Sequence, residues 1–162
     1  MKTADEILDE AFGDVSTPIR FRHRPDPIPG DLRIGWRLST LTLVLDQCRG
    51  KSANLEQVHL LLWGLRTDAG RELIKRWFSS GRRPDDPVVR YDPSLTRTIA
   101  LAVAGGLVIR KPNQTLTLSD EGQRMAAAVR QEEDVLGDEK RLLSELPKAI
   151  TQAKVRQLLE WR

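Results

Sequence analysis

The residue types that most often carry catalysis or hold a metal ion are sparse in this 162-residue sequence. Its two histidines, His23 and His59, have no carboxylate or thiol at the spacing of a metal site. Its single cysteine, Cys48, falls on the apolar side of a predicted helix, which favours a buried structural thiol over a reactive one. We therefore expect no metal site, no cofactor and no internal disulfide.

Two further patterns resemble reactive sites but lack the context that such sites need. Residues 49–52 read RGKS, like the end of a phosphate-binding loop, but that loop requires a glycine where Leu45 stands and follows a strand rather than a helix. The acidic residues at 85–86 and 132–134 lie in a loop or surface context, where solvated charge explains them. Because no nucleophile has a base in a plausible arrangement, we expect that the chain is not an enzyme.

Composition indicates a chain that can bury a hydrophobic core. It is 40% hydrophobic and 30% charged, with a net charge of +3. No apolar run is long enough to span a membrane, and the acidic N-terminus differs from a secretory signal. Together with the lone cysteine, these features predict a cytoplasmic protein. Lysine and arginine are in excess between residues 16 and 117, which permits nucleic-acid contact without requiring it.

Apolar spacing predicts a series of helices after an irregular N-terminal extension over residues 1–36. The extension combines a short helix with a proline-rich extended segment. Helices are then predicted from Arg37 to Gly50, after a capping box formed by Asn54 and Gln57, and around Ile74. Residues 88–91 are predicted to form a short strand.

The second half of the chain begins with a strong helix start at Asp92, which precedes a proline. The buried side of this helix is predicted to be Leu95, Ile99, Ala102 and Val103. Residues 107–110 and 115–118 read as a β-hairpin, and Ser119 is suited to cap the helix that follows. Residues 131–162 are predicted to be helical, with two leucine-rich apolar stripes and Trp161 near the end.

This order of helix, strand, turn, strand and helix resembles the winged-helix family over residues 37–130. The expected fold is therefore mainly α (α+β), with a winged-helix domain and a small hairpin as its wing. The N-terminal extension covers residues 1–36, and a C-terminal helical extension covers residues 131–162.

Two predicted helices carry apolar residues on the side opposite their core stripe. The helix after Asp92 takes the place of a recognition helix, yet that side offers one arginine among small and apolar residues, where a DNA-reading helix presents several polar side chains. The helix after Asn54 likewise has leucine and tryptophan opposite its core. Either the chain's own termini cover these sides or a partner protein does. The candidate partner contacts are Leu60, Trp63, Arg97, Leu101 and Trp161.

Basic residues provide an alternative function, that of a winged-helix DNA-binding transcriptional regulator. They occur at the predicted wing, in the loop before Asp92 and along the extended N-terminal segment. Each could contact phosphate without reading sequence, and a solvated basic loop explains each equally well. The candidate nucleic-acid contacts are Arg20, Arg22, Arg24, Arg82, Arg83, Arg110 and Lys111.

Four phrases of the sequence together resemble a known group of proteins. They are EAFGDVSTPIRFRHRPDPIPGDLRIGWRL, LVLDQCRGKSANLEQVHLLLWGLR, VRYDPSLTRTIALAVAGGLV and LTLSDEGQRMAAAV. They resemble the middle components of bacterial ABC-type three-component systems, which include the small accessory subunit of Lamassu anti-phage defence. The resemblance implies a small subunit that bridges an SMC-like ATPase and an effector such as a nuclease, with the reactive sites in those other chains. It also allows non-specific DNA contact within the complex.

Overall fold

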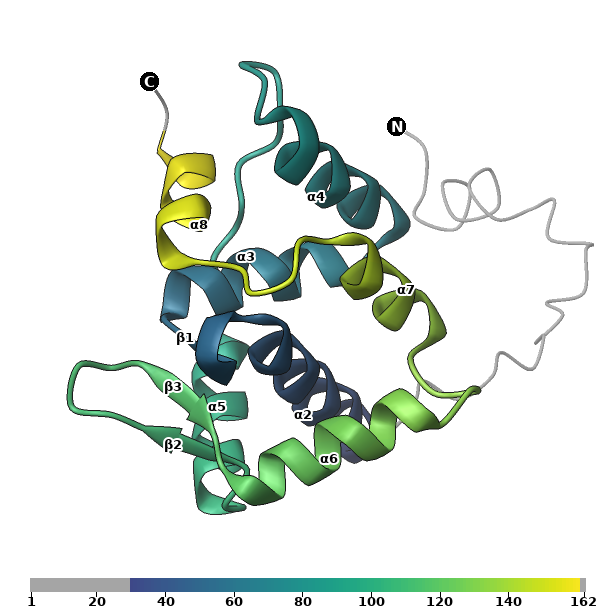
Figure 1. The fold of residues 1–162 in the computed structure, drawn as a ribbon, viewed down its shortest axis with the longest axis vertical. Coiled ribbons are helices and arrows are strands. Elements are labelled where there is room, and N and C mark those ends of the chain that lie inside the picture. Colours follow the sequence, from purple (N-terminus) through teal and green to yellow (C-terminus); the bar gives the residue numbers. More distant parts are fainter. Residues whose placement is uncertain (1–29, 161–162) are drawn as a thin grey trace, which may run out of the picture.

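The computed structural model describes the backbone of residues 30–160 and the side chains from residue 34 onward. Within this range, seven α-helices accompany a small three-stranded antiparallel sheet (Figure 1), so the prediction of a mainly α (α+β) fold is confirmed. The predicted N-terminal helix and the segment carrying His23, Arg20, Arg22 and Arg24 lie outside the described residues, as does Trp161.

Helix α2 (Gly30–Gln47) runs through the middle of the structure, in contact with α3, α5, α6, α7 and β3. Six consecutive residues from Thr40 to Leu45 have no exposed surface, so this part of the helix is buried on every side. The two buried threonine hydroxyls donate to carbonyls of the preceding turn, at 2.8 Å from Thr40 to Trp36 and 2.9 Å from Thr42 to Ser39. The helix starts seven residues earlier than its predicted start.

A short 3-10 turn η1 (Arg49–Lys51) and strand β1 (Ser52–Ala53) link α2 to α3 (Leu55–Leu65). The predicted capping box is confirmed: Asn54 Oδ1 accepts from the Gln57 amide at 2.9 Å, and Gln57 Oε1 accepts from the Asn54 amide at 3.0 Å. Strand β1 was not predicted, because two residues are too few to show an alternating pattern.

Helix α4 (Asp68–Ser80) and helix α5 (Ser94–Ala104) are joined by residues 81–93. The strand predicted at residues 88–91 is wrong. These residues follow an irregular path, with the side chains of Val88 and Tyr91 mostly in solvent and no described strand paired with them. Alternation alone cannot make a strand where no neighbour completes its hydrogen bonds.

The predicted hairpin is confirmed as β2 (Val108–Arg110) and β3 (Leu116–Leu118), and β1 pairs with β3 to give the order β1-β3-β2. Ser119 caps α6 (Asp120–Gln131), its hydroxyl accepting from the Gly122 amide at 3.0 Å. Gly122 packs directly against the chain before β2, since a Cβ atom there would lie 2.1 Å from the Leu107 carbonyl oxygen. Helices α7 (Gly137–Glu145) and α8 (Gln152–Leu159) complete the described chain.

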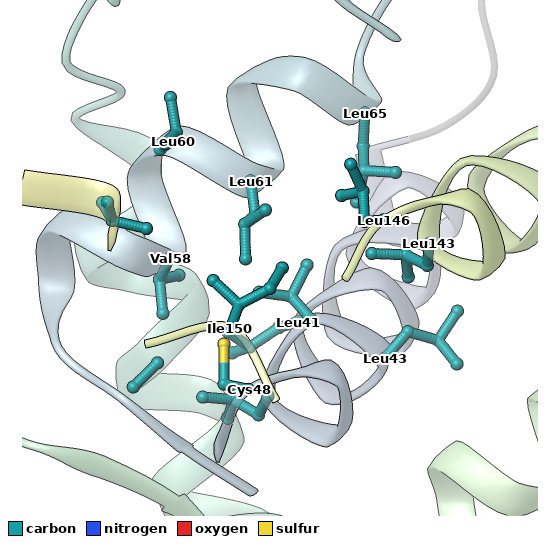
Figure 2. Packing of buried hydrophobic residues seen from close by; sticks show 14 of the residues in the cluster. Leu41, Leu43, Cys48, Val58, Leu60, Leu61, Leu65, Leu143, Leu146 and Ile150 are labelled. Atoms are coloured by element: carbon teal, nitrogen blue, oxygen red, sulfur yellow. The ribbon is translucent and has the colours of Figure 1, made fainter. Parts of the chain in front are cut away.

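One hydrophobic core includes residues from the helices and strands up to α6 and from the C-terminal helices α7 and α8. Figure 2 shows Leu41 and Cys48 packed close to Leu61 of α3 and Ile150. The backbone connects the same regions, since the Arg49 amide donates to the Ile150 carbonyl at 3.1 Å. Residues 131–160 are therefore part of the main core and do not form a separate layer.

The turn after α4 is fastened to the core by Asp86, whose side chain is only 6% exposed. Its carboxylate accepts from Trp77 Nε1 and from the Arg83 amide, both at 2.7 Å, and forms an ion pair with Arg76. The hydrogen bond from Arg76, with those from Arg83 and Trp77, lowers the pKa of Asp86 to about 2. Arg82 lies over the Trp77 ring, 4.6 Å from its centroid.

Replacing Asp86 tests this attachment. Asp86→Ala should lower the free energy of unfolding at neutral pH by about 1–3 kcal/mol, because the buried Trp77 indole N–H loses its acceptor. An aspartate in an unfolded chain has a pKa of about 3.9. Since the pKa is lower in the folded state, the stabilisation is present above about pH 4 and lost as the pH falls towards 2.

Urea unfolding of both proteins across this pH range measures the effect. We expect the stability difference between the native protein and the variant to shrink as pH falls. A difference that stays constant from pH 7 to pH 2 would contradict the proposed role of the ionised carboxylate.

Candidate functional site

Cys48 and His59, which the sequence offered as candidates for chemistry, both pack against other side chains of the fold. Cys48 is 3% exposed, and desolvation by burial raises the pKa of its thiol to about 12, so the predicted buried thiol is confirmed. The half-buried ring of His59 lies 4.4 Å from that of Tyr91, and desolvation lowers the pKa of His59. Among residues 30–160, no three histidines, cysteines or acids are grouped in a way that could hold a metal ion. No helix in this range has the length and apolar character needed to cross a membrane.

The outer side of α3 is covered by the chain itself. Leu60 has no exposed surface, and α3 contacts both α4 and α8. Trp63 is half-buried and stacks on Trp77, with ring centroids 5.3 Å apart. This corrects the candidate assignment of Leu60 to a partner interface, because a side chain with no exposed surface is not available to a partner. For Trp63, the main neighbour is Trp77.

The outer side of α5, in contrast, is open. Its buried positions are Leu95, Thr98, Ile99 and Ala102. Val103, predicted to be in the core, is 39% exposed, as is Leu101. Thr98 takes the buried place instead, and its hydroxyl donates to the Ser94 carbonyl at 3.1 Å. The buried side is therefore as wide as predicted but is rotated around the helix axis, from Val103 towards Thr98.

Strand β2 extends this open surface. The Leu107 amide, just before β2, donates to the Ala102 carbonyl at 2.9 Å, so the strand starts against α5. Ile109 in this strand is 55% exposed. Figure 1 places α5 and the hairpin at one end of the structure and α4 and α8 at the other. We call this surface the α5 face; it consists of Thr96, Arg97, Ala100, Leu101, Val103, Ala104 and Ile109, all exposed.

Asp92 holds the start of α5, but the predicted cap is displaced by one residue: α5 begins at Ser94, and Pro93 stands at the N-cap position. Asp92 Oδ1 accepts from the Ser94 amide at 3.0 Å. The carboxylate also forms ion pairs with Arg37 of α2, at 3.3 Å, and with Arg66 at the end of α3. Partial burial raises the pKa of Asp92, but the hydrogen bonds from Ser94 and Arg37 and the charge of Arg66 outweigh it and leave the pKa low. The α5 face is thereby fixed relative to α2 and α3.

The structure divides the candidate nucleic-acid contacts between two places. Arg110 and Lys111 are exposed on the hairpin, while Arg83 is exposed in the turn after α4, at the other end of the structure (Figure 1). Arg82 has structural contacts: besides lying over Trp77, it donates to the Pro87 carbonyl at 3.1 Å and the Leu158 carbonyl at 3.4 Å.

Two further basic residues belong with Arg82 and Arg83, although the sequence did not predict them as nucleic-acid contacts. Lys154 and Arg156 of α8 line one groove together with Arg82 and Arg83. More than 70 residues separate the two pairs, and no local pattern in the sequence connects them.

Unfolding of the isolated chain distinguishes the buried Leu60 from the partly exposed Leu101. Leu60→Ala should lower the free energy of unfolding by about 2–5 kcal/mol, because it leaves a cavity in the core. Leu101→Ala, at a partly exposed position, should cost about 0.5 kcal/mol. Urea denaturation of the two variants gives both values, and equal losses would show that Leu101 is packed internally.

Comparisons with known proteins return no match. No family model, no curated protein and no solved structure is similar to the chain. The resemblance of the four sequence phrases to the middle components of three-component systems therefore stays a prediction from those residues. The assignment of residues 37–130 to the winged-helix family stays a prediction too.

Proposed function

We propose that this chain is a non-catalytic, winged-helix accessory subunit that docks on a larger protein through the α5 face. The element order supports the winged helix: α2, β1, α3, then α5, β2 and β3, with α4 inserted before α5. The sheet order β1-β3-β2 agrees with it, because the strand after the first helix pairs with the second strand of the hairpin. In this assignment α5 is the recognition helix and residues 111–115 are the tip of the wing.

The observation that carries the proposal is the composition of the α5 face. A helix that reads DNA presents arginine, lysine, asparagine or glutamine to base edges and phosphates. The α5 face presents two larger aliphatic side chains, two alanines, one threonine and a single charge at Arg97, with Ile109 beside them. Complete burial of one large aliphatic side chain is worth roughly 1.5–3 kcal/mol. Leu101, Val103 and Ile109 are each more than one third exposed, and docking on a partner would bury this exposed apolar surface.

The positive charges on and beside the α5 face indicate which residues a partner must present. Arg97 on α5, and Arg110 and Lys111 beyond Ile109, are exposed and have no ion pair within residues 30–160. No acid belongs to the α5 face. A complementary surface is therefore apolar at its centre and carries carboxylates at its rim, because a basic rim would be repelled.

The identity of the partners comes from the sequence resemblance. The four phrases resemble the middle components of ABC-type three-component systems. We therefore propose that the chain bridges an SMC/ABC-type ATPase and an effector, such as a nuclease, in a cytoplasmic bacterial anti-phage defence complex. The α5 face would bind one of these two partners, and the reactions would take place in the partner chains.

A winged-helix transcriptional regulator is the second proposal, favoured by the exposed Arg110 and Lys111 on the hairpin. Such a protein would insert α5 into the major groove, where Arg97 is the only charged side chain on the outer side of the helix and Thr96 adds one hydroxyl. We place it second because the outward side chains of α5 offer so little to DNA.

Assembly with the proteins encoded by flanking genes tests the first proposal. The chain is co-expressed with the proteins of its flanking genes, which the proposal expects to encode an ATPase with a coiled-coil insertion and an effector. Leu101→Glu should remove the chain from the complex, because it places a charge in the centre of the docked surface. Val135→Glu is the matched control: Val135 is 42% exposed, close to the 39% of Leu101, but lies outside the α5 face.

Size-exclusion chromatography with mass determination provides the measurement, and thermal unfolding verifies that both variants fold. Loss of assembly with Leu101→Glu alone supports the proposal. A native chain that remains monomeric beside both neighbours, or a complex that tolerates Leu101→Glu, would reject it.

A further inference from the structure

An open groove of about 670 Å³ lies between the turn after α4 and the outer side of α8. It lies at the end of the structure away from the α5 face (Figure 1). Four cationic side chains line it: Arg82 and Arg83 from the turn, and Lys154 and Arg156 from α8. The only acid among its described lining residues is Glu160.

The two walls of this groove are fixed to each other. Helix α8 is anchored in the core by Val155 and Leu158, which are 0% and 3% exposed. From the opposite wall, Arg82 donates to the Leu158 carbonyl at 3.4 Å while lying over Trp77. Asp86 holds the turn itself through the Arg83 amide. The cations are therefore presented from a preformed surface, which lowers the ordering cost of binding.

The excess of positive charge here contrasts with the groove between α4 and α7. Between α4 and α7, a second groove contains Arg71, Lys75 and Arg141, each paired with an acid that also lines it. In the α8 groove, the side chains of Arg83, Lys154 and Arg156 have no hydrogen bond or ion pair within the described chain. An ionic ligand can thus bind them without first breaking an internal pair.

The groove's shape and lining identify the class of anion. Its volume far exceeds that of one phosphate, and its cations come from both walls of the groove. Three of the four are arginines, whose guanidinium groups match phosphate oxygens. The described lining residues include no aromatic side chain on which an unpaired base could stack. These features favour a series of backbone phosphates over a nucleotide or a base-stacked single strand.

We propose that this groove binds the phosphate backbone of duplex DNA without sequence preference. Arg83, Lys154 and Arg156 contact the phosphates, while Arg82 holds the walls together and adds its charge. The site is separate from the α5 face, so the chain would contact DNA at one end and a protein partner at the other. This interaction does not depend on a recognition helix.

Fluorescence anisotropy with the full chain and a labelled 20-base-pair duplex of mixed sequence tests the proposal. Measuring affinity at several salt concentrations gives the slope of log K against log salt. Lys154→Ala with Arg156→Ala should weaken binding and reduce that slope by roughly 1.8, because each phosphate contact contributes about 0.9. Arg110→Ala with Lys111→Ala removes the same charge from the hairpin and should leave both quantities nearly unchanged.

Each other outcome rejects the groove site. Loss of binding in the hairpin variant but not in the groove variant would place DNA on the wing, and an unchanged groove variant would show that these cations are not used. No measurable binding at low salt would also reject it.

Poly-glutamate that competes as strongly as unlabelled duplex would indicate an acidic protein segment as the ligand. Leu101→Glu should retain DNA binding, because Leu101 lies on the α5 face and not in the groove. The protein-docking proposal and the groove proposal can therefore fail independently.

Discussion

Complete burial of the middle of α2 is the constraint on which the other elements depend. A helix with no exposed residue from Thr40 to Leu45 requires apolar neighbours on every side. Helices α3, α5, α6 and α7 and strand β3 provide them. The threonine hydroxyls can be buried because each finds a carbonyl in its own helix. The C-terminal helices thereby become necessary to the core, which Ile150 and Leu143 share with Leu41 (Figure 2).

The same packing explains which surfaces are left for partners. Helix α3 is enclosed because α4 and α8 lie against it, and the Trp63–Trp77 stack fills the space next to α4. Helix α5 packs only its inner side on the core, while Asp92 fixes its start to Arg37 and Arg66. An apolar surface that is rigidly placed and uncovered by the described chain is suited to docking. At the opposite end, placing α8 beside the turn after α4 gathers cations into a groove.

Local signals in the sequence predicted the local structure well. Caps at Asn54 and Ser119 and helical apolar spacing located the helices, and the hairpin was predicted to within one residue at each strand. Long-range packing accounts for what was missed. Strand β1 exists only because β3 pairs with it, and residues 88–91 have no such neighbour. Leu60 looks like an outward residue on a helix with one buried side, but α4 and α8 both pack against α3 and Leu60 has no exposed surface. The groove cations come from segments far apart in the sequence and meet only in the folded chain.

The central claim is that the α5 face lies against a protein partner, and site-specific photo-crosslinking tests it most directly. A benzophenone amino acid is placed at residue 101, or at residue 135 as the control of similar exposure. The labelled chain is then irradiated together with the ATPase and effector from the flanking genes. The account predicts a covalent product with one of these proteins from position 101 and none from position 135. Equal crosslinking from both positions, or none from position 101, would contradict it.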